Sequence, residues 1–137
     1  MKLFIDSSAF AKRFIEERGS QEVEALCARA DELGLSILCV PEIISALNRR
    51  LREKDLTKLD YTKAKQHLSQ DVRDADIIHL TQEVIQSGIQ LLETNPLRTM
   101  DALHVACAIA WKTDLFVSSD HRQLAAAKNA GLKTKQV

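Results

Sequence analysis

Four acidic residues stand where side chains can gather at one end of a parallel β-sheet. They are Asp6, Glu42, Asp101 and Asp120. Asp6 and Asp120 follow short apolar runs, while Glu42 and Asp101 fall in the first turns of expected helices. Parallel strands end, and the helices after them begin, at one edge of the sheet, and a helix N-terminus favours a carboxylate. We therefore expect the four carboxylates to meet.

Carboxylates brought this close repel one another unless a cation neutralises them. An all-oxygen ligand set suits Mg²⁺, with Mn²⁺ as a possible substitute. Such a centre can generate hydroxide from water, orient it and stabilise the charge that develops on a phosphoryl group. Ser8 and Ser118, each two residues from an aspartate, can hold the carboxylates or a bound water. Each acid alone could equally be a turn or first-turn helix residue, and it is their number at one edge that favours a metal site.

The elements that must position these acids follow from the hydrophobic pattern. Buried strands are expected at residues 3–5, 35–40, 76–80 and 115–117, with an edge strand in the polar tail. Helices are expected from Ser20 to a stop at Gly34, from Pro41, over about 60–74, from Thr81 to Asn95, from Thr99, and through 124–127 to Gly131. Strands that alternate with helices predict an α/β fold whose parallel sheet is covered on both faces.

The bulk composition narrows the class of protein. The 137 residues fit a single domain, 1–137, and the 19 basic and 19 acidic residues cancel, which argues against nucleic-acid binding by an overall positive field. The three cysteines include no C-x-x-C pair, so we expect buried thiols in a reducing compartment rather than disulfides or a zinc site. No stretch approaches the ~20 apolar residues of a membrane span, and the apolar run at the N-terminus is too short for a signal peptide. We therefore expect a cytoplasmic protein that does not bind membranes.

Several basic residues are candidates to contact substrate phosphates. Arg49 lies on nearly the same helix face as the glutamate, and Arg98 comes just before the third acid. Lys12 and Arg13 are comparable candidates, although a solvated helix face explains the run around Arg49 about as well. His104, one helical turn after Asp101, is expected to have a structural role rather than to bind metal.

Four stretches of the chain form a recognisable set: LFIDSSAFAKRFIEERGS, VPEIISALNRR, PLRTMDALHVACA and LFVSSDHRQLAAAKNAGL. Together they resemble the PIN-domain family, and within it the VapC-type toxins of toxin–antitoxin modules. The combination of D-x-S, P-E, L-R-x-x-D-A-L-H and S-x-D matches the family in order and approximate spacing along nearly the whole chain. The resemblance implies a three-layer α/β/α domain with a mostly parallel sheet and Mg²⁺-dependent endoribonuclease activity.

The resemblance also assigns roles to residues of this chain. The family's acidic positions fall on Asp6, Glu42, Asp101 and Asp120, and its hydroxyl positions fall on Ser8 and Ser118. On this hypothesis Asp6 and Asp101 bind the principal metal, Asp120 completes the site directly or through water, and Glu42 positions or deprotonates the attacking water. Cleavage of RNA would leave a 5′-phosphate and a 3′-hydroxyl. A homodimer and a cognate antitoxin that covers the acidic pocket are implied as well.

Three other functions remain open at this point. A metal-dependent DNA nuclease would use the same acidic pocket, although the compact chain lacks an insertion for threading DNA. A non-catalytic RNA- or protein-binding PIN module is the second, and the presence of all four acids speaks against it. A small-molecule phosphohydrolase is the third, and it would need a substrate pocket that the sequence does not visibly encode.

Overall fold

A computed structural model describes all residues from 1 to 137 as strands and helices in alternation. The strands are β1 (Lys2–Ile5), β2 (Glu32–Ser36), β3 (Asp76–Ile78), β4 (Leu115–Ser118) and β5 (Thr134–Gln136). The helices are α1 (Ser7–Phe10), the 3₁₀-helix η1 (Ala11–Arg13), α2 (Ser20–Arg29), α3 (Cys39–Arg52), α4 (Lys58–Arg73), α5 (Gln82–Thr94), α6 (Thr99–Trp111) and α7 (His121–Asn129). None of these helices has the length and apolar character needed to cross a membrane.

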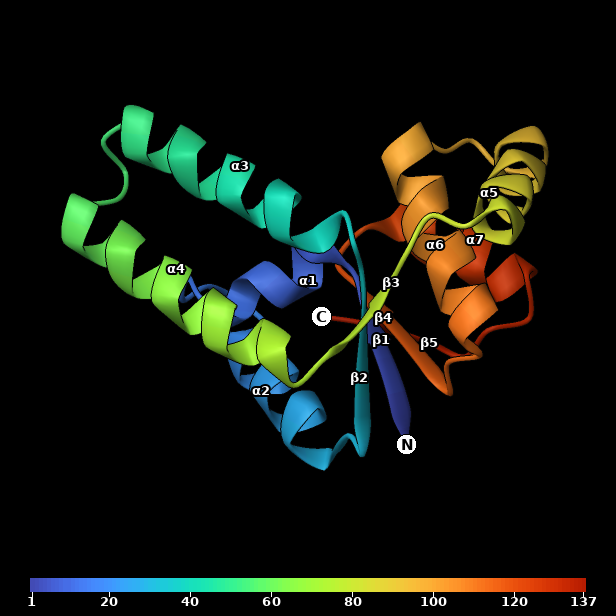
Figure 1. Ribbon diagram of the computed structural model, residues 1–137, viewed down its shortest axis with the longest axis horizontal. Coiled ribbons are helices and arrows are strands. Elements are labelled where there is room, and N and C mark those ends of the chain that lie inside the picture. The colour runs from blue at the N-terminus through green and yellow to red at the C-terminus, as the bar shows by residue number, and fades with distance from the viewer.

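The five strands form one parallel sheet in the order β3-β2-β1-β4-β5 (Figure 1). Figure 1 shows the sheet between two helical layers, with α1 to α4 on one side and α5 to α7 on the other. The three-layer α/β/α architecture with a parallel sheet is therefore confirmed, and so is the edge strand in the polar tail. The carboxyl ends of the strands all lie at the same edge of the sheet.

Side chains alternate across the sheet and feed two separate hydrophobic cores. On β1, Leu3 and Ile5 pack into the core beneath α1 to α4, while Phe4 packs into the core beneath α5 to α7. On β4, Val117 joins the first core and Phe116 the second. This two-residue period is the geometry of a strand that is buried on both faces.

The boundary that the sequence predicted between the helix from Ser20 and the strand after it was wrong. Helix α2 ends at Arg29, and Gly34 lies inside β2 rather than after the helix. A Cβ on Gly34 would come 2.7 Å from the ring of Trp111, so the glycine lets the indole lie directly against the strand. Helix α3 starts at Cys39, which makes Pro41 its third residue; this is tolerated because the first N–H groups of a helix have no intrahelical partner.

Short helix α1 follows β1 directly and was not predicted. Asp6 is its N-cap, and the Asp6 side chain accepts a hydrogen bond from the backbone N–H of Ala9. The cap of α1 is therefore one of the four acids that were singled out for chemistry.

The caps of three other helices can be compared with the prediction. The N-cap residues of α2 and α6 are Gly19 and Arg98, each one residue before the expected cap, whereas Thr81 caps α5 as predicted.

Candidate functional site

Asp6 lies directly after β1 and is fully buried. Its Oδ1 accepts hydrogen bonds from the Ala9 N–H at 3.0 Å and the Ser8 hydroxyl at 2.8 Å, and its Oδ2 is 2.8 Å from both the Ser8 and the Ser118 hydroxyls. Burial raises the pKa of Asp6, although these hydrogen bonds oppose the shift. The Asp6 carboxylate is thus enclosed by protein groups on both of its oxygens.

The hydrogen bonds of Asp6 extend to the loop after β4. The Ser118 hydroxyl accepts from the backbone N–H of Asp120 at 2.9 Å, and the Ser8 hydroxyl accepts from the N–H of Ser119 at 3.2 Å. Each serine therefore bonds Asp6 on one side and this loop on the other. The network fixes the segment that carries Asp120 against the end of β1.

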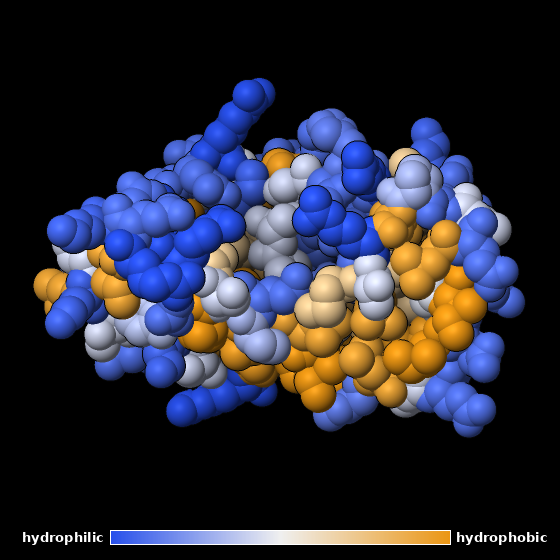
Figure 2. Space-filling view, turned by 90° about the horizontal axis from the view of Figure 1, so that it is seen from above, coloured by the Kyte–Doolittle hydropathy of each residue, from blue (hydrophilic) through white to orange (hydrophobic).

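The other three acids, Glu42, Asp101 and Asp120, line one open cavity of about 740 Å³ at the carboxyl edge of the sheet. Figure 2 looks onto this edge and shows a hollow with mainly hydrophilic side chains around it and a hydrophobic band along one side. No group of three or more His, Cys, Asp or Glu side chains is close enough together to enclose a metal ion. The structure therefore brings three of the four predicted acids to one cavity and places Asp6 beneath it.

Asp101 and Asp120 are each held through a single oxygen. The Gln123 amide donates to Asp101 Oδ1 at 2.9 Å, and the N–H groups of Arg122 and Gln123 donate to Asp120 Oδ1 at 2.8 and 3.2 Å. The Oδ2 atom of each aspartate has no protein hydrogen bond. Burial and the nearby charge of Asp120 raise the pKa of Asp101. Two carboxylates thus present an unbonded oxygen while their charges oppose each other.

Glu42, in the first turn of α3, is likewise held through only one of its two carboxylate oxygens. Its Oε1 accepts from the Ser7 hydroxyl at 2.9 Å and contacts His104 Nε2, while its Oε2 has no protein hydrogen bond. Burial alone would raise the pKa of Glu42, but its hydrogen bond and charge interaction with His104 outweigh burial, and the net shift is downward. A negatively charged Glu42 is therefore favoured at the cavity.

Three residues that hold the acids were not identified as site residues from the sequence. They are Ser7, His104 and Gln123. The one-turn spacing between Asp101 and His104 was a visible signal, and the structural role expected for His104 agrees with its burial. Gln123 offered no signal beyond its place in the turn after Asp120.

The predicted phosphate contacts differ in their surroundings. Arg98 lines the cavity, and so does Arg122, which the sequence did not single out. Neither arginine forms an ion pair, although three carboxylates share the cavity with them. Arg49 is exposed on α3 and lies outside the cavity lining. Arg98 and Arg122 are thus the two arginines that line this cavity.

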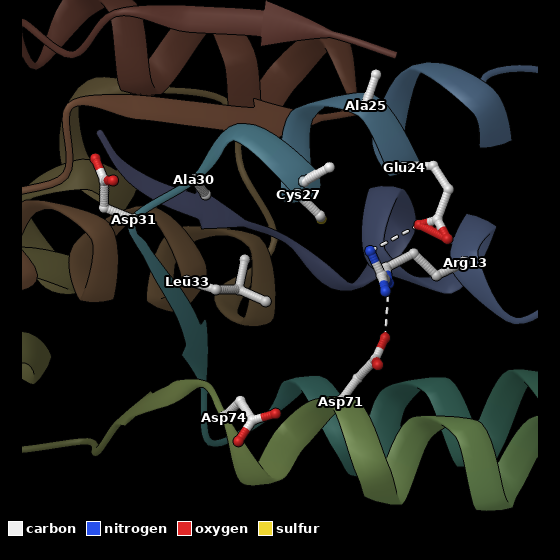
Figure 3. A pocket seen from close by; sticks show the side chains of 10 residues that line it. Arg13, Glu24, Ala25, Cys27, Ala30, Asp31, Leu33, Asp71 and Asp74 are labelled. Atoms are coloured by element: carbon white, nitrogen blue, oxygen red, sulfur yellow. Dashed lines mark hydrogen bonds and ion pairs between the residues drawn. The ribbon is translucent and has the colours of Figure 1, made fainter.

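Lys12 and Arg13, the other two candidates for phosphate contacts, do not line this cavity, and both are paired with other protein groups. A second cavity of about 710 Å³ lies between α2 and α4, and Figure 3 shows Arg13 at its end between Glu24 and Asp71. The guanidinium is 2.7 Å from Glu24 Oε2 and 2.6 Å from Asp71 Oδ2. Lys12 Nζ donates to the backbone carbonyl of Arg18 at 2.7 Å. Both side chains join structural elements to one another.

An α/β/α sandwich with acidic side chains at the carboxyl edge of its parallel sheet is the class of domain that this structure defines. The sequence profile of the PIN domain matches residues 3–129. Ribonucleases VapC45 and VapC49 of Mycobacterium tuberculosis are each 32% identical to this chain over 108 residues, which cover 79% of this chain and 75% of theirs. The chain therefore belongs to the PIN-domain family, and these relatives are VapC ribonucleases.

Solved structures agree on the fold. VapBC2 from Rickettsia felis, bound to a DNA fragment from its promoter, matches with a TM-score of 0.71 and 12% identity, over 100% of this chain and 99% of the other. VapC20 of Mycobacterium tuberculosis, a sarcin–ricin-loop-cleaving toxin, matches with a TM-score of 0.68 and 19% identity, over 90% and 94%. At such identities the likeness shows a shared fold.

Proposed function

We propose that this chain is a divalent-metal-dependent endoribonuclease and the toxin of a toxin–antitoxin pair. One observation carries the proposal: Glu42, Asp101 and Asp120 are each anchored through one oxygen and leave the other unbonded at one cavity. Relatives that are named ribonucleases support RNA as the substrate. Two arginines without an ion-pair partner, Arg98 and Arg122, line the same cavity, which supports a substrate that carries phosphate.

The donor set at the cavity fits Mg²⁺ or Mn²⁺. Unbonded carboxylate oxygens are the hard ligands that these ions prefer, and Mg²⁺ is commonly held by one or two carboxylates plus waters and substrate phosphate. The raised pKa of Asp101, caused by burial and by the nearby Asp120, marks a place where negative charge lacks compensation. A cation there would relieve the repulsion. Because Mg²⁺ is commonly held by only one or two carboxylates, such a site does not require a closed cage of three protein ligands.

Asp101 and Asp120 would hold the cation through their free Oδ2 atoms. Asp6, which the sequence hypothesis placed on the metal, would join them only if its carboxylate exchanged a serine hydroxyl for the ion. In the present arrangement Asp6 supports Asp120 through Ser118. A bound Mg²⁺ would supply a more acidic water and neutralise charge on the phosphate.

The protein's own groups would handle the attacking water and the RNA. Glu42 Oε2 is free to accept a proton from that water, and Arg98 and Arg122 are free to bind phosphate oxygens. The water oxygen bonds to phosphorus as the bond from phosphorus to the 3′ oxygen breaks. A 5′-phosphate remains, and protonation of the departing oxygen gives a 3′-hydroxyl.

Cleavage of total bacterial RNA by the purified protein tests this proposal. The wild type should cleave RNA with Mg²⁺ and not with EDTA, and Asp101→Asn should slow cleavage at least about 100-fold. Asp60→Asn is the matched control, because Asp60 is also a first-turn acid but lies on α4 in the other helical layer. Cleavage that is unaffected by EDTA or by Asp101→Asn contradicts the proposal, and cleavage of single-stranded DNA instead of RNA establishes a DNA nuclease.

A protein partner that covers the cavity is part of the same proposal. Several solved structures with this fold are VapBC complexes, described as such for Rickettsia felis and Haemophilus influenzae. The cavity is open, and its unpaired arginines and acids offer both charge signs to a partner. The product of a small gene beside this one, added to the RNA assay, should suppress cleavage.

We also propose that two copies associate through the exposed face of α5. Ile85, Ile89 and Leu92 are spaced four and three residues apart and are 40%, 45% and 37% exposed. They therefore form one apolar stripe along the helix. Figure 2 shows a hydrophobic band along one side of the molecule. A two-fold axis would let the stripe meet its own copy.

A further inference from the structure

Beneath the cavity, three side chains from different elements meet around one carboxylate oxygen. Ser7 comes from α1, Glu42 from α3 and His104 from α6. The Ser7 hydroxyl donates to Glu42 Oε1 at 2.9 Å, and His104 Nε2 contacts the same oxygen and lies 3.2 Å from Ser7 Oγ. His104 is only 1% exposed, whereas the Glu42 side chain is 31% exposed, so the histidine side of these contacts is shielded from water.

The arrangement differs from the serine–histidine–acid triad that the same residue types can form. In that triad one imidazole nitrogen faces the serine and the other faces the acid. Here Nε2 faces both Ser7 and Glu42, while Nδ1 is buried without any hydrogen-bond partner. The Ser7 hydroxyl donates to Glu42 Oε1. Activation of Ser7 as a nucleophile therefore does not follow from this geometry.

The contacts divide the two oxygens of Glu42 between two tasks. Oε1 is held by groups from two other elements, and Oε2 is left without a protein hydrogen bond at the cavity. Fixing a glutamate side chain costs rotamer entropy, and leaving the imidazole Nδ1 unpaired in the interior costs further free energy. A buried leucine at position 104 would avoid the cost of an unpaired Nδ1. We therefore expect the imidazole to have a role that a leucine could not fill.

We propose that His104 is a positioning residue for Glu42: it fixes Oε1 so that Oε2 faces the attacking water. This inference rests on the proposed function, because it concerns the same reaction. His104 is not itself part of the cavity lining, and its side-chain hydrogen-bond contacts are with Glu42 and Ser7. The contact with the carboxylate requires a proton on His104 Nε2 in either the neutral or the charged ring.

Kinetics of three variants test the inference. His104→Leu removes the donor, His104→Gln places an amide N–H where Nε2 was, and His79→Gln replaces an exposed histidine outside the cavity. We expect His104→Leu to lower kcat for RNA cleavage about 100-fold with little change in KM, because small misplacements of a reacting group are costly. His104→Gln should restore most of kcat, and His79→Gln should match the wild type.

Two outcomes overturn the inference. One is wild-type kcat in His104→Leu. The other is an equal loss of kcat in the Leu and Gln variants together with an equal fall in melting temperature, which indicates a packing role alone. A wild type that cleaves no RNA overturns the proposed function instead, so the two failures are distinguishable.

Nitrogen-15 NMR of the imidazoles gives a second readout that needs neither metal nor RNA. The chain has four histidines, and the signal that disappears in His104→Gln identifies His104. We expect its Nε2 to carry a proton at neutral pH, and we expect Glu42→Gln to shift the His104 signals but not those of His79. An unprotonated Nε2, or His104 signals that ignore Glu42→Gln, contradict the proposed contact.

Discussion

At the scale of single residues, Asp101 has the least compensated charge at the cavity. Burial and the charge of Asp120 both raise its pKa, and the Gln123 amide is its one hydrogen-bond donor. Because the folded pKa is raised, the folded protein keeps the proton to higher pH than the unfolded chain does. Ionised Asp101 therefore lowers the free energy of unfolding above the ordinary aspartate pKa, and the full cost is reached above the raised value.

Asp101→Asn should accordingly stabilise the metal-free protein. The asparagine keeps an acceptor for Gln123 and removes the charge, so its melting temperature in EDTA should exceed that of the wild type at about pH 7. The gain should shrink toward about pH 4, where the wild-type carboxylate takes up its proton. Thermal melts at both pH values check this, with Asp60→Asn as the control. A variant less stable than the wild type at pH 7 contradicts the prediction.

The acids could be found from the sequence because strand ends and helix starts of a parallel sheet share one edge. Their partners could not. Ser7, Glu42 and His104 meet only because α1, α3 and α6 converge, and that packing is not readable from spacing along the chain. The sequence hypothesis also placed Asp6 on the metal. Its role as N-cap of an unpredicted helix, enclosed by hydroxyls, appears only in three dimensions.

At the scale of elements, the alternation of strands and helices was predictable and their boundaries less so. Gly34 resembled a helix stop because glycine commonly follows a helix. Its actual role is to admit the Trp111 ring, which approaches from α6, far away in the sequence. Helix α1 was missed because four residues are too few to show helical periodicity. Long periodic helices such as α5 were located within a residue or two.

At the scale of the whole molecule, the α5 stripe is the surface proposed for a homodimer. Ile89→Glu should shift the protein from twice the mass of one chain to a single chain in light scattering, because two buried charges would face each other across the axis. Leu59→Glu is the matched control, since Leu59 is 63% exposed on α4. A wild type that is already monomeric, or an Ile89→Glu variant that stays dimeric, contradicts this interface.

The central claim is that the free oxygens of Asp101 and Asp120 bind a divalent cation at the carboxyl edge of the sheet. Anomalous X-ray scattering from crystals soaked in Mn²⁺ tests this most directly. We predict a manganese peak within ligand distance of both Oδ2 atoms, about 2.0–2.3 Å, and no such peak in crystals of Asp101→Asn. Manganese absent from this cavity, or bound only elsewhere on the molecule, would contradict the account.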